Sequence, residues 1–245
     1  MGLDMESRYM PVNGRKSNYE IQCEMAQKKF CQLDHEKMIK KFALPKEGNC
    51  VYFNYVNHRY QINLENGMVY YSDNGKVCCS ESKNSGCEVL GSELSGNGIY
   101  NNETYNKKAG FDEIMAIFDV LCESKENLTL SGEWAIAQSL DYNVHYGNGT
   151  GIDMYAGYTN AFEGRMEELK TACEKLGGKP SKYADISYEI PVFDFMNVIF
   201  EFWDSDEEFP AKVQILWDKK VLDYVKFETT YYIAGHLMQQ IQENM

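Results

Sequence analysis

The amino-acid sequence predicts an α+β fold in a single domain, with a β-meander and a C-terminal β-hairpin covered by several helices. Three observations lead to this prediction. From residue 50 to residue 79 apolar side chains recur at every second position between turn residues, which is the period of strands. Residues 111–122 and 228–242 repeat apolar side chains at helical spacing. Residues 192–217 contain two apolar segments on either side of an acidic turn, as in a hairpin.

The composition restricts the classes of partner. The chain has 245 residues, enough for a large core, and its 37 acidic against 24 basic residues give a net charge of −13. This charge repels phosphate backbones and anionic lipids, so we expect neither nucleic acid nor a membrane surface as a partner. No apolar run approaches the roughly 20 residues that span a bilayer, and the N-terminus lacks the regions of a signal peptide. A cytoplasmic location is therefore expected.

The cysteine pattern favours reduced thiols over a disulfide framework, because no secretion signal accompanies it. The eight cysteines are Cys23, Cys31, Cys50, Cys78, Cys79, Cys87, Cys122 and Cys173. Thiolates such as Cys78, Cys79 and Cys87, with Cys50, are ligands that zinc or an iron–sulfur cluster prefers. No C-x-x-C pair is present, however, and adjacent cysteines on a strand point to opposite faces. We therefore assign no metal site.

The chain is predicted to begin with a flexible tail, residues 1–18, and to continue as one domain, residues 19–245. Two short helices open this domain. The first covers residues 19–30, and the second is capped by Asp34 and ends before Pro45.

A β-meander follows, because short segments of period two are separated by turn residues. The segments are residues 50–56, 59–64, 68–72 and 76–79, and Asn-Gly pairs between them favour tight hairpin turns. Residues 80–108 are rich in Ser, Asn, Gly, Glu and Lys and have few apolar side chains, which predicts a mobile excursion.

The middle of the chain is predicted to be mainly helical. Residues 111–122 form an amphipathic pattern that predicts a helix covering a sheet. A turn at Ser131-Gly132 leads into a short strand or helix. The glycine-rich segment 145–158 lacks both the spacing of a phosphate-binding loop and the strand that precedes one. Residues 162–176 are predicted to form a helix that ends at Gly177-Gly178.

The C-terminal part is predicted to form a strand hairpin closed by a helix. Residues 185–190 are predicted to begin the strand region. Residues 192–203 are apolar on both alternating sets apart from Asp194, Asn197 and Glu201, which predicts one central strand covered on both faces. Residues 211–217 alternate cleanly, which predicts a half-buried strand. In the helix of residues 228–242, a row at steps of four borders the buried stripe: Tyr232, His236 and Gln240.

Several segments resemble a known protein family. They are FWDSDEEFPAKVQILWD at residues 202–218, SGEWAIAQSL after the first amphipathic helix, and ACEKLGG before the strand pair. From about residue 19 to residue 241 the sequence is similar to an uncharacterised family catalogued as a domain of unknown function, number three-seven-eight-six. The resemblance implies a mixed α+β domain and implies no catalytic roles.

The acidic turn between the last two strands is one candidate site. Carboxylates gathered in a turn suit Mg²⁺ or Ca²⁺, or an acid–base pair. The turn lacks the spacing of a calcium loop, and charged turns at a sheet edge also protect against edge pairing. Both interpretations stay open for its residues, which are Asp204, Asp206, Glu207 and Glu208.

A second candidate group combines the tryptophans at the hairpin ends with the polar row of the last helix. A pocket there would be formed by Trp203, Trp217, Tyr232, His236 and Gln240, with His145 of the glycine-rich segment. The alternative is a hydrogen-bonded boundary histidine beside ordinary core aromatics.

The motifs of serine hydrolases, kinases and dinucleotide-binding proteins are absent. Aromatic residues make up 13% of the chain and offer apolar pocket walls. We therefore predict a module that binds an unidentified small molecule or protein. The alternative is an enzyme that uses the acidic turn, with or without a divalent metal, or His236 as an acid–base group. No catalytic residue, cofactor or oligomeric state follows from the sequence.

Overall fold

The computed structural model describes residues 16–72, 105–140 and 155–245. These residues form an α+β fold, as predicted, in which helices pack on an antiparallel sheet. No helix in these ranges is long and apolar enough to cross a membrane.

The chain enters the fold through two helices whose first turns are capped. α1 spans Asn18–Phe30, and its cap is reciprocal: the Ser17 hydroxyl accepts the Glu20 N–H while the Glu20 carboxylate accepts the Ser17 N–H. α2 spans His35–Phe42, and the Asp34 carboxylate accepts a backbone N–H in its first turn. Both predicted helices are confirmed.

The predicted meander is confirmed for its first three strands. These are β2 (Cys50–Tyr55), β3 (His58–Asn63) and β4 (Val69–Ser72), paired in sequence order. Two short strands extend it: β1 (Lys46–Glu47) pairs with β2, and β5 (Lys107–Lys108) pairs with β4.

The turn between β2 and β3 lies one residue earlier than the Asn57-His58 turn of the prediction. Val56 and Asn57 have φ of 41° and 61°, the positive values that a two-residue hairpin turn of type I′ needs at both central positions. Gly67, with φ of 66°, serves the next turn as predicted. The fourth segment, residues 76–79, and nearly all of the predicted excursion lie outside the described residues.

The helices predicted for the middle of the chain are confirmed, one of them with a shifted start. α3 spans Phe111–Glu123, and β6 spans Trp134–Ile136 before a single 3-10 turn. The predicted helix over residues 162–176 is confirmed as α5, Met166–Lys175, but it begins four residues later than expected, and a separate helix, α4, spans Ala156–Phe162. Gly164 separates them with a φ of 71°, which a right-handed helix does not accept.

The prediction of one strand over residues 192–203 is wrong. β8 spans Ile186–Phe193 and β9 spans Met196–Trp203, with a two-residue turn between them. The apolar pattern runs through this turn because Phe195 stacks on Phe193, with ring centroids 5.5 Å apart. Because Phe195 is packed in this way, the turn between β8 and β9 is not recognisable from hydropathy.

The last strand pair and the closing helix follow the prediction. β10 spans Lys212–Asp218 and pairs with β9, and β7 (Lys179–Pro180) is a short addition beside β8. α6 spans Phe227–Asn244. Its expected apolar stripe is fully buried: Ile233, Ala234, Leu237, Met238 and Ile241.

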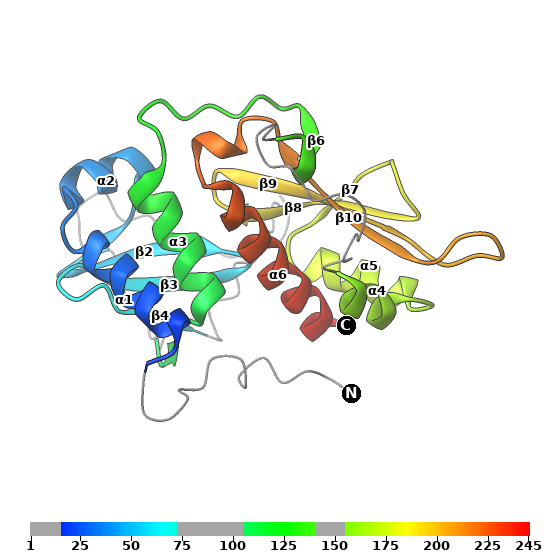
Figure 1. Ribbon diagram of the computed structural model, residues 1–245, viewed down its shortest axis with the longest axis horizontal. Helices are drawn as coiled ribbons and strands as arrows, with labels where there is room; N and C mark the ends of the chain where they lie inside the picture. Colours follow the sequence, from blue (N-terminus) through cyan, green and yellow to red (C-terminus); the bar gives the residue numbers. More distant parts are fainter. Residues whose placement is uncertain (1–15, 73–104, 141–154) are drawn as a thin grey trace, which may run out of the picture.

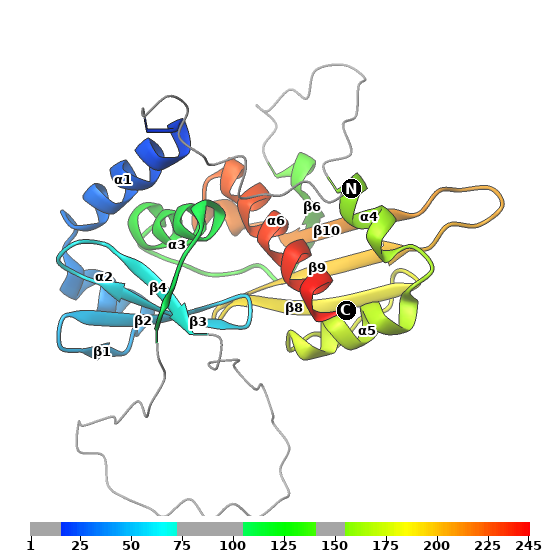
Figure 2. The same cartoon turned by 90° about the horizontal axis from the view of Figure 1, so that it is seen from below.

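In the described part of the chain, the strands build one sheet in the order β5-β4-β3-β2-β8-β9-β10-β6. We call β1–β5 the meander half and β6–β10 the hairpin half. The halves meet where β2 pairs with β8 through Tyr55 and Phe193. Figure 1 shows α6 lying across this junction, and Figure 2 shows α1, α3 and α6 on the same side of the sheet.

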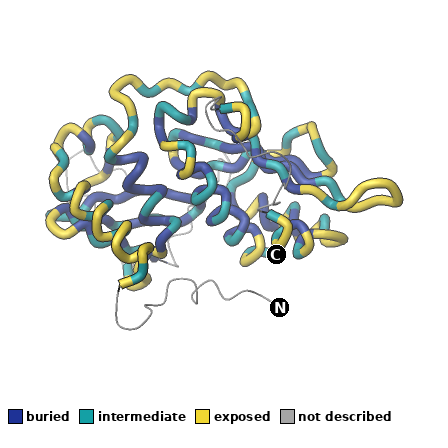
Figure 3. The backbone as a smooth tube through the Cα atoms, viewed as in Figure 1, coloured by how far each residue is buried: buried dark blue, intermediate teal, exposed yellow. Residues whose placement is uncertain are grey.

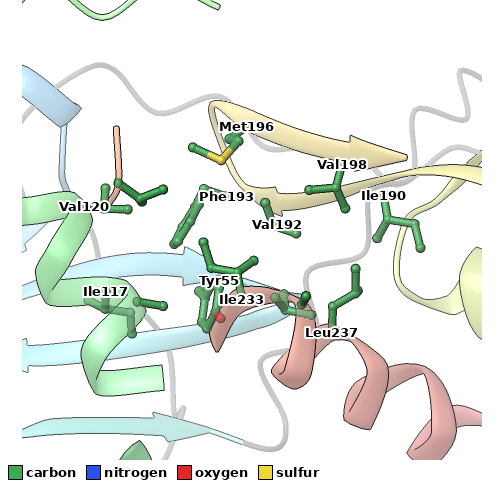
Figure 4. Packing of buried hydrophobic residues seen from close by; sticks show 14 of the residues in the cluster. Tyr55, Ile117, Val120, Ile190, Val192, Phe193, Met196, Val198, Ile233 and Leu237 are labelled. Carbon is green, nitrogen blue, oxygen red and sulfur yellow. The ribbon is translucent and has the colours of Figure 1, made fainter. Parts of the chain in front are cut away.

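The core follows this arrangement. Figure 3 shows buried backbone along the strands and α6, whereas α1 and the loop between β9 and β10 are largely exposed. At the junction, Ile117 of α3 and Ile233 of α6 approach Tyr55 and Phe193 of the strands, as Figure 4 shows. The same region of the core therefore receives side chains from both halves.

Candidate functional site

A cavity of about 660 Å³ lies between α1, the start of α3 and α6. This volume is within the range of about 300–1,000 Å³ that small-molecule sites occupy. Its lining includes Tyr19, Cys23, Phe111, Glu113, His236 and Gln239.

Glu113 is the buried carboxyl of this cavity. It lies in the first turn of α3 and is 9% exposed. The N–H of Gly110 donates to one carboxyl oxygen, and the hydroxyl of Tyr60, on β3, donates to the other. Burial raises the pKa of Glu113, and the hydrogen bonds from Tyr60 and Gly110 offset only part of this shift. The carboxyl thus holds a proton more readily than an exposed glutamate does.

His236 faces Glu113 from α6. Its ring stacks on Tyr55, with centroids 5.0 Å apart and an angle of 17° between the planes. Its buried Nε2 lies 4.0 Å from Oε1 of Glu113, beyond hydrogen-bond distance. Among the residues that the structure describes, this nitrogen has no hydrogen-bond partner. Burial, with a smaller contribution from the charge of His58, lowers the pKa of His236 to about 3, so the imidazole is neutral at pH 7.

Two tyrosines of the meander half complete the group. Tyr55 and Tyr60 are fully buried, and burial together with the charge of Glu113 raises the pKa of both hydroxyls well above 10. The hydroxyl of Tyr55 also finds no hydrogen-bond partner within the described ranges. We refer to Tyr55, Tyr60, Glu113 and His236 as the buried polar cluster.

The buried polar cluster offers hydrogen-bonding groups with shifted pKa values. The raised pKa of Glu113 makes it a weaker acid than an exposed glutamate, and the lowered pKa of His236 makes it a neutral base. Strongly shifted groups beside a cavity are typical of binding and catalytic sites, although buried networks in ordinary cores are shifted as well. Within residues 16–72, 105–140 and 155–245, no group of three or more His, Cys, Asp or Glu side chains is arranged to hold a metal ion.

The polar row expected on the last helix lies close to this cavity. Tyr232, one turn before His236, contacts Phe111 edge-on, with ring centroids 5.4 Å apart. Gln240, one turn after it, is buried and donates to Glu243 at 2.9 Å. His236 is the residue of this row that lines the cavity.

The acidic turn lies elsewhere, in the loop that extends from the hairpin half in Figure 1. Asp204 accepts the N–H of Gly164 at 3.0 Å, and Asp206 accepts the N–H groups of Glu208 and Phe209 at 2.8 and 2.7 Å. These bonds shape the turn, since short acidic side chains commonly cap backbone N–H groups in turns. Glu207 and Glu208 are exposed.

Neither Trp203 nor Trp217 lines the cavity that contains His236. Trp203 is half-buried at the end of β9, with the Lys212 ammonium 5.3 Å from its ring centre. Trp217 is 1% exposed inside the hairpin half. Of the residues predicted for that pocket, His236 lines the cavity, Trp203, Trp217, Tyr232 and Gln240 do not, and His145 lies outside the described residues. The pocket as a whole stays a prediction. Of the thiols considered for a metal, Cys50 is half-buried on β2, and Cys78, Cys79 and Cys87 lie outside the described residues.

Asp218 is a second buried carboxylate, and its role is structural. Asp218 accepts N–H groups from Ser131, Gly132 and Lys220 at 2.6–3.0 Å. Burial alone would raise its pKa, but these hydrogen bonds outweigh that effect and the pKa is lowered. The anionic form of Asp218 is thus favoured and fastens a loop, whereas the pKa of Glu113 is shifted in the opposite direction.

The sequence reasoning missed Glu113, Tyr55 and Tyr60. One signal was available, because Glu113 stands four residues before Ile117 and so falls on the buried side of its helix. The partners were not visible, since Tyr60 and His236 are distant in the sequence and only the tertiary fold brings them to Glu113.

Comparisons with known proteins give one result. A family model described as domain of unknown function (DUF3786) matches residues 94–240. Glu113 and His236 lie within this range, whereas α1, Tyr55 and Tyr60 precede it. No curated protein and no solved structure matches the chain.

Proposed function

We propose that this chain, which belongs to the family of the domain of unknown function DUF3786, binds a small molecule in the cavity between α1, α3 and α6. The observation that carries the proposal is that His236 lines the cavity and that its buried Nε2 has no hydrogen-bond partner in the described structure. A ligand group that reaches this nitrogen and Glu113 would supply the missing bond.

The energetic argument concerns the cost of an unpaired polar atom. A buried nitrogen without a partner costs about 1–3 kcal/mol, which folding must offset elsewhere. The hydroxyl of Tyr55, adjacent in the ring stack, carries the same cost. Two such atoms, one of them on a residue that lines the cavity, favour a site for a polar ligand group, because a core selected only for stability would use apolar side chains of similar shape.

A ligand screen by thermal shift, with a library of small neutral, cationic and anionic molecules, tests this proposal. The variant His236→Phe keeps a ring on Tyr55 but removes Nε2, so a true ligand should bind it at least about tenfold more weakly, the factor that 1.4 kcal/mol gives. Asp206→Asn, at the acidic turn, is the matched control and should leave affinity unchanged. A ligand that stabilises wild type and His236→Phe equally would refute the proposed site.

A second candidate function is an enzyme that moves a proton at the same cavity. The pKa of Glu113 is raised and that of His236 is lowered, so an acidic carboxyl and a neutral base stand 4.0 Å apart. Once a ligand is identified, exchange of its protons with deuterated water distinguishes the two functions. An enzyme should catalyse exchange that Glu113→Gln abolishes, whereas a binding protein should leave the ligand unlabelled.

The acidic turn stays a prediction as a divalent-cation or acid–base site. Its two short carboxylates already accept backbone N–H groups, so the cavity has the better support.

A further inference from the structure

We infer that the N-terminal half of α1, residues 18–24, is a movable wall of this cavity, which lifts away from α3 to admit the ligand. The C-terminal end of the helix stays attached. This inference rests on the proposed function, since it concerns access to the same cavity. It combines the burial of the two groups proposed to bind the ligand with the unequal anchoring of the helices that line the cavity.

The groups proposed to bind the ligand are nearly closed off in the structure. His236 is 6% exposed and its Nε2 is buried, while Glu113 is 9% exposed. Both residues line the cavity, but a ligand inside it does not reach Nε2 while this atom stays buried. A wall of the cavity must therefore move when a ligand bonds to this nitrogen.

α3 and α6 are fixed walls of the cavity, because much of each helix faces the core. α3 buries nine of its 13 residues, and α6 buries nine of its 18. Moving either helix would return apolar surface of the core to water, which is unfavourable. Residues 108–110, which also line the cavity, are held by the Ala109 N–H, which donates to the carbonyl oxygen of Val69 at 3.0 Å.

α1 is anchored much less. It has 13 residues, as α3 does, but of these only Phe30, at its last position, is buried. Cys23, Ala26 and Gln27 are half-buried, and the other residues are exposed. Figure 2 shows α1 outside α3, on the side away from the strands. Elements that bury few apolar contacts open at the lowest cost in free energy, so α1 is the wall that moves.

The C-terminal end of α1 is its fixed end. The ring of Phe30 packs against Phe118 of α3, with centroids 4.8 Å apart, and against His35 of α2, with centroids 5.0 Å apart. The ion pair between Lys29 and Glu123 of α3 lies in the same last turn. These contacts hold this end in place when the other end lifts.

The N-terminal half of α1 contacts α3 through exposed side chains. Tyr19 meets Phe111 of α3 edge-on, with 4.9 Å between ring centroids, and is itself 40% exposed. Ile21, in the same half, is 43% exposed. An exposed aromatic contact restrains a helix less than a buried ring such as Phe30 does.

Two polar interactions of this half are formed within α1 and the residues before it. The Glu20 carboxylate accepts the N–H of Ser17, and Glu24 pairs with Lys16. Neither interaction involves α3. The N-terminal half can therefore lift without separating these pairs, and both carboxylates keep their partners.

The packing between α1 and α3 is also incomplete. A second cavity, of about 340 Å³, lies along the same pair of helices and is lined by Met25 and Ala26 of α1 and by Met115 and Phe118 of α3, among others. Side chains that line a void lose dispersion contacts on that side. α1 thus borders unfilled space in two places, which weakens its attachment to α3.

Movement of α1 would change the proposed site directly. Lifting the N-terminal half separates Tyr19 from Phe111 and widens the cavity that Glu113 and His236 line. The side chains that α1 supplies to this cavity are Tyr19, Glu20, Cys23, Glu24 and Gln27.

Amide hydrogen exchange tests the movement without a ligand. A short helical segment without tertiary partners is marginal in water, so the amides of residues 21–24 should exchange from the open form. We expect protection factors at least about hundredfold lower for these amides than for those of residues 117–121 in α3. Equal protection in the two helices would reject the inference, because α1 would then not open separately.

Acylation by diethylpyrocarbonate tests whether this movement controls access to His236. The neutral imidazole attacks a carbonyl carbon of the reagent and releases ethyl carbonate, and mass spectrometry locates the N-carbethoxy adduct. Because Nε2 is buried, acylation should follow the population of the open form and be far slower than in a short histidine peptide. His58, which is 8% exposed and does not line the cavity, is the internal control.

Ser17→Ala is the sharpest variant, because Ser17 caps α1 but does not line the cavity. Loss of an N-cap should raise the open population of the helix about fivefold. The exchange of residues 21–24 and the acylation of His236 should therefore both increase about fivefold, with the acylation of His58 unchanged. A thermal melt establishes that the variant folds.

A second variant releases the contact at the moving end. Tyr19→Ala removes the edge-on pair with Phe111 and should increase both rates at least about threefold. Tyr183→Ala makes the same change at a tyrosine that is 72% exposed and does not line the cavity. This matched control should change neither rate.

The outcomes separate this inference from the proposed function. If α1 exchanges faster in Ser17→Ala but acylation of His236 does not, α1 does not control access and the inference fails. Acylation of wild-type His236 as fast as in a histidine peptide also rejects it, since the cavity would then need no movement. In both cases a ligand that His236→Phe binds more weakly would still support the proposed function. If acylation follows α1 but the ligand screen finds no binding that depends on His236, the movable wall stands and the proposed function fails.

Discussion

The two halves of the sheet bury different chemistry beneath their helices. Beside the meander half, Tyr60, Glu113 and His236 place hydroxyl, carboxyl and imidazole groups in the interior. Beneath α4 in the hairpin half, Phe162 packs edge-on against Phe200 and Phe202, with ring centroids 6.2 Å from each. One half therefore accepts polar groups at an energetic cost, and the other gains stability from apolar burial. The comparison separates the part of the fold built for stability from the part that carries the candidate site.

The hairpin half also buries polar groups, but on the other face of its strands. Glu201 lies between Phe200 and Phe202 in β9, so its side chain points away from α4. Ser187 and Gln214 are its neighbours across the sheet, and Gln214 donates to it at 3.1 Å. The difference in buried chemistry between the two halves is thus restricted to the face of the sheet that the helices cover.

The largest change in stability is expected for a core substitution in the hairpin half. Phe200→Ala removes a fully buried ring and leaves a cavity, so we expect a loss of about 3–5 kcal/mol in the free energy of unfolding. Urea denaturation measures this loss, and ligand binding at 25 °C should persist in the folded fraction. A loss below about 1 kcal/mol would mean that this half is not the stabilising part of the fold.

The next largest effect is a loss of stability at acidic pH caused by His236. The unfolded histidine binds a proton below pH 6.5, whereas folded His236 binds one only near pH 3. The unfolded state therefore binds more protons in this window, and stability falls as the pH falls. Between pH 6.5 and 4.5 His236 should account for a loss of about 2.3 kcal/mol in the free energy of unfolding, because the slope approaches 1.36 kcal/mol per pH unit as the unfolded histidine becomes protonated.

Glu113 opposes this effect, because its raised pKa makes the folded state bind a proton above pH 4.5, and that contribution to stability is lost as the pH rises through the folded pKa. The comparison of wild type with His236→Phe in urea at several pH values isolates the histidine. Parallel curves for the two proteins would show that His236 is not buried as a neutral base.

A smaller effect is expected for the bond inside the buried polar cluster. Tyr60→Phe removes the hydroxyl that donates to Glu113 and should cost about 1.5 kcal/mol, as for hydrogen bonds to carboxyl groups. The same change should raise the pKa of Glu113 further, since the Tyr60 hydroxyl lowers it. Carboxyl titration by NMR checks the second part. An unchanged pKa would indicate that Tyr60 and Glu113 are not bonded in solution.

The smallest effect is expected at the acidic turn. Asp206→Asn with Glu207→Gln should change stability by no more than about 0.5 kcal/mol, because both residues are exposed and asparagine can still accept the turn's N–H groups. Melts with Mg²⁺, Ca²⁺ and Mn²⁺ should then give the same result for both proteins. A metal-dependent rise in wild type that the double variant lacks would transfer the candidate site to this turn.

The sequence was sufficient where a local pattern determines the structure. The stripe of α6, the cap at Asp34 and the alternation of β10 were all predicted because each depends on residues close in the chain. Prediction failed at Phe195, where a turn residue is packed by aromatic stacking and hydropathy no longer marks the turn. Val56 is a similar case, since a β-branched residue seldom adopts positive φ.

The candidate site was predictable only in part. His236 was selected because it borders an apolar stripe, and the cavity does include it. Tyr55 and His236 are 181 positions apart in the sequence, and the ring stack that joins them forms only when α6 lies across the junction of the two halves. Glu113 is likewise buried only when α3 packs against β3 and α6, which supply Tyr60 and His236.

The narrow junction between β2 and β8 has a mechanical consequence. One residue pair, Tyr55 with Phe193, and the bond from the Val56 N–H to the Val192 carbonyl join the two halves edge to edge. We call this connection the hinge. Tyr55 also stacks on His236, so a residue of the hinge contacts a side chain that lines the cavity. We therefore expect a movement of one half against the other to shift the Tyr55 ring and to change the space beside Nε2. Occupation of the cavity should in turn stiffen the hinge, which slowed amide exchange of Val56 would report.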